Sequence, residues 1–299
     1  MDFFKIIDQL SEVDADVLGR FDSRRAVFSS LGTAAKRSAL AATPLFLGAL
    51  FQKAYAGTTA TADEVLQYGL ALELFEQDFY RKMQASTQYA NATVAEKAAI
   101  DQIKRHEDSH VTLLRGAITG LGKIPVTGVT FKAAVFATLT TFKIGPAATT
   151  QLGIAQLLED TGVRAYKGRA GELLGTDLLT VALQIHSVEA RHAAKIRDMR
   201  GQRAWVNPAD DLASNAVYTS GVTAGSTPAR FGLAVPPYTA ASPREDNVMQ
   251  GAVGSAPAVN ITSGLGTPYT AADAQASFDE FLQVAEVLDE SRAGAFIGA

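Results

Sequence analysis

Apolar residues recur three, four and seven positions apart over most of the segment 61–201. This spacing places them on one face of an α-helix, whereas strict alternation would indicate a strand. The pattern predicts four long helices, over residues 61–84, 94–120, 146–173 and 176–201. Each has an apolar stripe that must be buried, so the segment 60–201 is predicted to form an all-α four-helix bundle.

Polar residues and glycines mark where these helices begin and end. Thr93 followed three residues later by Glu96 predicts a capping box, and Pro146 suits the first turn of the third helix. Thr176 or Asp177 is expected to cap the fourth helix. The connection 123–145 is longer than the others and includes a short helical piece near 131–142, so the bundle should contain one crossover.

The pattern changes in the last third of the chain, residues 202–299. Gly, Pro, Ser and Thr predominate, which predicts a long irregular extension. Its apolar residues predict that it packs on the bundle: Trp205, Phe231, Leu233 and Val235. A final helix is expected from Thr270 to residue 290, with an apolar face made by Phe278, Phe281, Leu282, Ala285 and Leu288.

Residues 1–56 have the order of an export signal. Arg24 and Arg25 precede an apolar run over 39–51, and Ala54-Tyr55-Ala56 forms a small-x-small site. The Ser-Arg-Arg-x-x-Phe core resembles a twin-arginine signal, which predicts a periplasmic or otherwise exported protein. The alternative is an N-terminal helical segment retained as structure, in a cytoplasmic protein. The apolar run is short for a transmembrane helix, and none is expected.

Composition narrows the chemistry. The chain is 47% hydrophobic with a net charge of −4, and it has no basic run that would suggest a nucleic-acid partner. It has no cysteine, which excludes disulfides and thiolate ligands. Any metal must therefore be held by His, Asp or Glu. The four histidines lie in two short clusters, His106 with His110 and His186 with His192.

Candidate metal ligands occur in an internal repeat. Glu73 is followed seven residues later by Tyr80, and Glu159 by Tyr166. Between and after them come two E-x-x-H pairs, Glu107 with His110 and Glu189 with His192. Glu73 and Glu159 are 86 residues apart, and the two E-x-x-H pairs are 82 residues apart. The repeat is therefore a duplicated helix hairpin.

The four glutamates lie on apolar helix faces. Unpaired buried carboxylates cost several kcal/mol each, which two divalent cations would offset, with one imidazole for each ion. The pattern therefore predicts a dinuclear site, although it does not say which glutamates bridge. Glu76 competes with Glu73, but it breaks the repeat and Glu73 is preferred. Oxygen and nitrogen ligands favour iron or manganese, which the sequence does not separate.

The string HEDSH, residues 106–110, also matches the H-E-x-x-H helix of zinc hydrolases. That minor alternative makes His106 and His110 ligands but leaves Glu189 and His192 as coincidence. On the dinuclear hypothesis His106 is only a neighbour or surface residue, whose replacement should leave metal content largely intact. His186 lies on the face of Glu189 and is the better candidate for an extra ligand or proton relay.

The pieces ALELFEQDFY, HEDSHVTLLRGAITGLG, TGVRAYKG and VEARHAAKIR resemble the ferritin-like superfamily, in particular its desiccation-related branch. The resemblance implies metal-binding carboxylates at Glu73, Glu107, Glu159 and Glu189, imidazoles at His110 and His192, and supporting tyrosines at Tyr80 and Tyr166. It implies a di-iron or di-manganese oxidoreductase that acts on O2 or peroxide in stress protection. A non-enzymatic scaffold is the alternative, and a homo-oligomer is left open.

Overall fold

The computed structural model describes residues 59–173, 176–210, 215–219, 231–233, 242–250, 259–263, 269–290 and 292–298. The predicted signal or helical segment 1–56 lies outside these residues.

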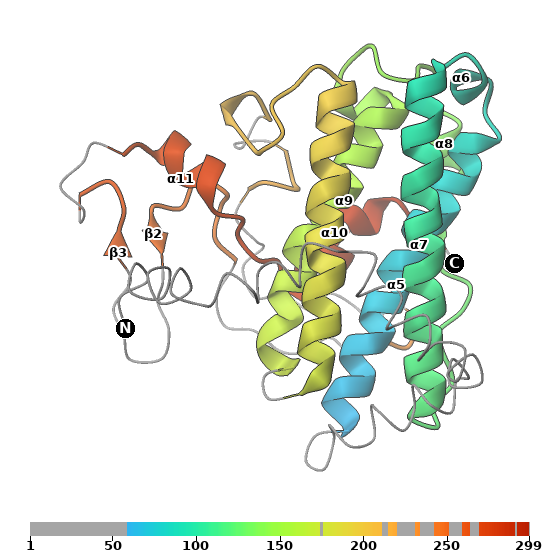
Figure 1. Cartoon of the computed structure of the whole chain (residues 1–299), viewed down its shortest axis with the longest axis vertical. Helices are drawn as coiled ribbons and strands as arrows, with labels where there is room; N and C mark the ends of the chain where they lie inside the picture. The colour runs from blue at the N-terminus through green and yellow to red at the C-terminus, as the bar shows by residue number, and fades with distance from the viewer. Residues whose placement is uncertain are drawn as a thin grey trace, which may run out of the picture. The chain divides into compact units, whose positions relative to one another are not determined.

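Four long helices dominate the described part of the chain. They are α5 (Thr59–Gln84), α7 (Val94–Gly120), α9 (Gln151–Ala170) and α10 (Asp177–Met199). They lie side by side in Figure 1, and α5 packs mainly on α7 while α9 packs mainly on α10. The bundle therefore consists of two helix hairpins, which confirms the predicted all-α class.

Local chemistry accounts for the helix ends. Thr93 and Glu96 form the predicted capping box at the start of α7. The third helix begins later than predicted, because residues Ala147–Thr149 form a 3-10 turn and the Thr150 hydroxyl then accepts from the Gly153 N–H to cap α9. The Thr176 side chain caps no N–H of α10.

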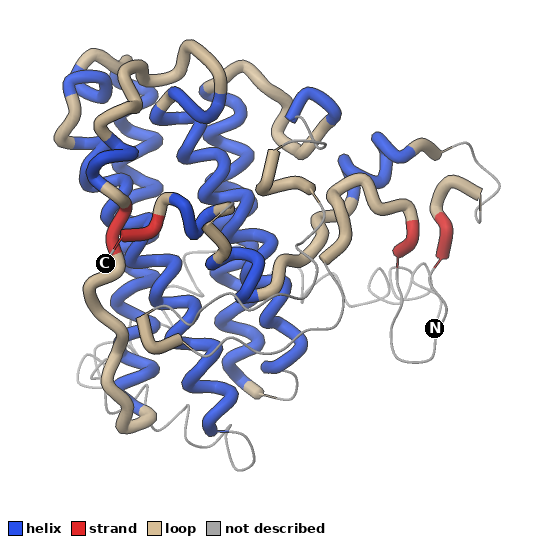
Figure 2. Tube along the Cα trace, turned by 180° about the vertical axis from the view of Figure 1, so that it is seen from behind, coloured by secondary structure: helices blue, strands red, loops and turns tan. Residues whose placement is uncertain are grey.

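The crossover contains less helix than predicted over 131–142. Only α8 (Ala133–Phe136) is α-helical, and β1 (Thr130–Phe131) pairs antiparallel with β4 (Ile297–Gly298) near the C-terminus (Figure 2). The Phe131 ring packs against the rings of Phe75 and Phe79 on α5 and of Phe296, with centroids 4.9–5.9 Å apart. Pairing between distant segments and burial of Phe131 thus replace the local helical preference.

Several shorter elements lie outside the four long helices. They are α6 (Thr87–Ala90), the 3-10 turns Gly171–Leu173, Pro208–Asp210 and Ala293–Ala295, and the antiparallel pair of β2 (Met249–Gln250) with β3 (Val259–Asn260). None of the helices in these described ranges combines the length and the apolar character needed to cross a membrane.

The prediction of a single C-terminal helix from Thr270 is wrong. The structure has two short helices, α11 (Ala271–Ser277) and α12 (Val284–Leu288), separated by extended backbone, and Phe278 is 39% exposed. The backbone between them bonds to α9 instead: Leu282 N–H donates to the Arg164 carbonyl at 3.0 Å, and Arg164 Nε donates to the Glu280 carbonyl at 3.0 Å. Gly168 permits this approach, since a Cβ there would lie 2.0 Å from the Leu282 carbonyl oxygen.

Candidate metal centre

Six of the predicted site residues converge in the middle of the bundle, from all four long helices. They are Glu73 on α5, Glu107 and His110 on α7, Glu159 on α9, and Glu189 and His192 on α10. The four glutamates are 0% exposed. The E-x-x-H spacing places each Glu and His of a pair on one face of its helix, which the bundle turns inward.

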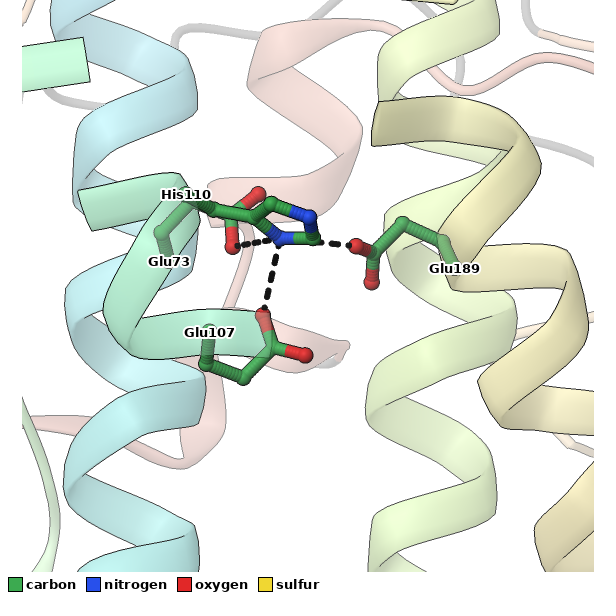
Figure 3. A group of neighbouring side chains, drawn as sticks. All are labelled: Glu73, Glu107, His110 and Glu189. Atoms are coloured by element: carbon green, nitrogen blue, oxygen red, sulfur yellow. Dashed lines mark hydrogen bonds and ion pairs between the residues drawn. The ribbon is translucent and has the colours of Figure 1, made fainter. Parts of the chain in front are cut away.

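The imidazole of His110 lies among three carboxylates (Figure 3). Its Nδ1 is 3.1 Å from Glu73 Oε2, 3.2 Å from Glu107 Oε2 and 3.4 Å from Glu189 Oε1. A neutral imidazole carries one N–H, and it cannot donate a hydrogen bond to three carboxylates. Ligand atoms about 2.1 Å from one octahedral ion lie about 3.0 Å apart, so a cation fits this convergence.

His192 occupies the corresponding position in the other hairpin. Its Nδ1 lies 2.9 Å from Glu107 Oε1 and 3.1 Å from Glu159 Oε2. The two oxygens of Glu107 therefore face different histidines, as expected of a carboxylate that lies between two positions for a cation.

The described residues include two overlapping groups whose ligand atoms lie within 4.8 Å of one another. One group is Glu73, Glu107, His110 and Glu189, and the other is Glu107, Glu159, Glu189 and His192. Glu107 and Glu189 belong to both. The tertiary structure thus distinguishes shared from unshared carboxylates, which the sequence pattern leaves open.

Three of the four oxygens of the shared carboxylates lack a hydrogen-bond partner among the described residues. No N–H or O–H group of the described residues donates to Glu107 Oε1 or to either oxygen of Glu189. Burial raises the pKa of Glu107 and of Glu189 well above the usual range, and the neighbouring carboxylates raise it further. Because buried carboxylates are normally paired or bound to metal, these orphaned oxygens fit a metal-binding role.

Two tyrosines link the hairpins. The Tyr80 hydroxyl on α5 donates to Glu159 Oε1 on α9, and the Tyr166 hydroxyl on α9 donates to Glu73 Oε1 on α5. Burial raises the pKa of both tyrosines well above the usual range, so both are neutral donors at neutral pH. Each tyrosine thus orients the glutamate of the other half of the repeat. The Glu and Tyr that lie seven residues apart in one helix therefore have their partners in the other hairpin.

Glu76 is buried beside the centre but belongs to neither group. Burial, followed by the charges of Glu159 and Glu73, raises its pKa well above the usual range. It faces Gly162 of α9, where a Cβ would lie 3.4 Å from Glu76 Oε1 and 3.1 Å from Glu189 Oε2. Gly162 occupies the repeat position equivalent to Glu76, so one half supplies the extra carboxyl group and the other the space for it.

The other two histidines differ in position. His106 contacts a candidate ligand: its ring stacks on His192 with centroids 5.2 Å apart, and its Nδ1 lies 2.9 Å from His192 Nε2. No repeat position signals this contact, since the equivalent residue is Val188. His186 is in neither group, its Nε2 has no partner among the described residues, and the charges acting on it are those of Asp279 and Lys167.

Comparison with known proteins agrees with this architecture. Residues 61–202 match the family model described as the ferritin-like domain. No curated protein matches the chain. The matched segment begins near the start of α5 and ends just after α10, so it contains all six converging residues. The fold is thus an all-α, ferritin-like bundle with a buried cluster of Glu and His that can hold metal.

Proposed function

We propose that this protein binds two divalent metal ions, iron or manganese, and uses them to react with dioxygen or peroxide. Glu73 with His110 and Glu159 with His192 would hold one ion each, and Glu107 with Glu189 would lie between the ions. When bound, the pair would supply two electrons: dioxygen with two protons then gives hydrogen peroxide, and hydrogen peroxide with two protons gives two waters.

The observation that carries this proposal is the membership of Glu107 and Glu189 in both groups of potential ligands. Four carboxylates and two imidazoles match two divalent cations in charge and donor number. A single zinc site of the H-E-x-x-H hydrolase type would leave Glu159, Glu189 and His192 without a role. His106, which that alternative requires as a ligand, is engaged with His192 Nε2.

The protein's own residues would orient the ligands and exclude water. Tyr80 and Tyr166 fix one oxygen each of Glu159 and Glu73, which leaves the other oxygen facing the centre. The apolar stripes of the four helices surround the carboxylates. Such a dry, pre-oriented set of oxygen ligands suits a redox-active pair of ions.

Metal analysis of the full chain tests the proposal. Wild-type protein should bind two Fe or Mn per chain and oxidise Fe(II) or consume peroxide, and the Glu107→Ala, Glu189→Ala double variant should lose both properties. Glu64→Ala, an exposed change on α5, is the matched control. Full metal occupancy without turnover would favour the scaffold, and a single zinc bound through His106 and His110 would overturn the proposal.

Membership of the desiccation-related branch, a role in stress protection and export through a twin-arginine signal extend the proposal. They rest on the quoted sequence resemblances and on the order of residues 22–57. Fractionation of cells that make the full chain, with N-terminal sequencing, tests export. Exported protein that begins at Gly57 supports it, and an Arg24→Lys, Arg25→Lys variant should stay inside the cell. Wild-type protein retained in the cytoplasm with Met1 contradicts it.

A further inference from the structure

A small cavity lies inside the bundle about one helical turn from the metal centre. Its volume is about 20 Å³, enough for one or two water-sized molecules. All four long helices contribute to its walls, which are almost entirely apolar. Gly69 precedes Glu73 by one turn, Leu114 follows His110 by one turn, and Ile185 precedes Glu189 by one turn.

The repeat explains why the bundle is hollow at this end. Gly69 lines the cavity, whereas its equivalent in the other hairpin is Ala155. Ala182 also lines it, whereas its equivalent is Ile100. Ala155 and Ile100 are both 0% exposed. Gly69 and Ala182 thus leave space at positions where the duplicated sequence has larger residues.

One residue that lines the cavity also contacts a candidate metal ligand. Tyr166 lines the cavity, and its hydroxyl donates to Glu73. A Cβ at Gly69 would lie 3.4 Å from the Tyr166 hydroxyl oxygen and 3.6 Å from Leu114 Cδ1. The missing side chain at Gly69 therefore leaves space directly beside the group formed by Glu73 and His110.

Two buried polar residues also line the cavity, Arg169 and Tyr68, which are 4% and 2% exposed. Arg169 Nη1 pairs with Glu172 at 2.8 Å, but Nε and Nη2 of Arg169 and the Tyr68 hydroxyl have no hydrogen-bond partner among the described residues. These donor atoms are buried, and the walls are almost entirely apolar, so the donors do not form the surface of the cavity. Because Glu172 already balances the Arg169 charge, a neutral guest is favoured over an anion.

We propose that this cavity binds a neutral two-atom oxygen oxidant, dioxygen or hydrogen peroxide, beside the metal centre. Its size excludes a larger organic substrate, and its apolar walls suit a small neutral guest. The inference rests on the proposed function for the identity of the guest. The cavity itself is independent of metal binding, and the two can fail separately.

Xenon tests the cavity without any activity measurement, because it occupies small apolar cavities. Crystals of the full chain under xenon pressure should contain a xenon atom between Gly69, Leu114 and Ala182. The Ala182→Ile variant, which copies the residue of the other hairpin, should lose it. Absence of xenon at this place in wild-type crystals would overturn the proposed cavity.

Rapid mixing tests the guest. Anaerobic protein loaded with Fe(II) is mixed with dioxygen, with hydrogen peroxide, or with ferricyanide, which takes electrons without entering the cavity. Ala182→Ile should slow oxidation by the cavity's guest about tenfold while iron content and the ferricyanide rate stay unchanged. Leu183→Ile, on the same helix and 47% exposed, is the matched control.

The reactions with the different oxidants distinguish the outcomes. Slowing with dioxygen alone, with peroxide alone or with both identifies the guest and supports the proposal. Unchanged rates with both oxidants overturn it even if xenon binds. If wild-type protein binds no metal, the proposed function fails, and the guest is tested in the metal-free protein instead. Dioxygen and hydrogen peroxide are then used as competitors for xenon. Displacement of xenon supports binding of that oxidant in the cavity, and no displacement by either overturns the proposal.

Discussion

His192 is held from outside the metal centre by a second histidine. Its Nδ1 faces Glu107 and Glu159, and its Nε2 lies 2.9 Å from His106 Nδ1. A hydrogen bond on the outer nitrogen of a metal-binding imidazole fixes its tautomer and ring orientation. His106, whose other ring nitrogen lies 2.6 Å from Gln102 Nε2, is therefore a positioning residue for His192.

Replacement of His106 should weaken metal binding without changing the amount of metal bound at saturation. His106→Phe keeps a ring but removes the hydrogen bond, so Mn(II) affinity should fall about 10–100-fold while saturating metal still fills the site. Competition with a chelator measures the affinity. His186→Phe is the control and should bind as wild type. Equal loss in both variants would contradict the assigned role of His106, and loss in His186→Phe alone would restore His186 as a ligand.

Glu76 allows a test based on pH. Its pKa is raised in the folded protein, so between the ordinary glutamate value and that raised value the folded state holds a proton that the unfolded state releases. Stability of the metal-free protein therefore falls as pH rises through this window. Glu76→Gln removes the effect and should be more stable than wild type at pH 7, with little difference at pH 4.

Urea unfolding of metal-free Glu76→Gln at the two pH values measures this difference. The variant should also retain full metal content, because Glu76 is in neither group of potential ligands. Loss of one metal per chain would instead make Glu76 a ligand, and equal stability gains at both pH values would contradict the protonation argument.

At the scale of elements, the start of α7 is held by both a cap and a tether. Glu96 accepts from the Thr93 N–H at 2.9 Å and pairs with Lys143 of the crossover at 2.6 Å. The Lys143 hydrogen bond, opposed by partial burial and aided by the Thr93 hydrogen bonds, lowers the pKa of Glu96 to about 2. A local capping signal thus also anchors a distant connection.

Glu96→Ala should destabilise the protein by about 1 kcal/mol at pH 7. Because the folded pKa is lowered, the contribution of the charge is present above the ordinary glutamate pKa and is lost as pH falls towards 2. The difference from wild type in urea unfolding should therefore shrink between pH 5 and pH 2. Exposed Glu64→Ala is the control, and a difference independent of pH would show that the charge is irrelevant.

At the scale of the whole molecule, buried arginines connect the bundle to the C-terminal extension. Arg197 of α10 is 0% exposed and contacts Asp160 at 2.5 Å, Asp210 at 2.8 Å and the Tyr218 hydroxyl at 3.0 Å. Arg164 of α9 pairs with Glu245 at 2.7 Å. These contacts make Asp210, Tyr218 and Glu245, which follow the bundle in the sequence, part of the folded core.

Arg197→Met should cost about 3–5 kcal/mol, because it leaves Asp160 and Asp210 buried without a cation. Urea unfolding of the variant measures this loss. Arg203→Met, an exposed arginine beyond the end of α10, is the control and should change stability by less than about 0.5 kcal/mol. A loss below about 1 kcal/mol for Arg197→Met would mean that the extension contributes little to stability.

The sequence alone determined the helical class, the four long helices and the duplicated ligand pattern. These depend on local periodicity and on spacing along one helix, and both can be counted in the chain. A repeat that can be recognised without any knowledge of packing identifies Glu73, Glu159 and the two E-x-x-H pairs.

Only the tertiary structure decided which groups meet across helices. It distinguishes Glu107 and Glu189 as shared carboxylates, brings His106 against His192, and directs each tyrosine to the opposite hairpin. It also breaks the predicted C-terminal helix, because Arg164 offers hydrogen bonds to residues more than a hundred positions away. Periodicity describes one helix at a time, whereas burial, charge pairing and empty space arise between helices.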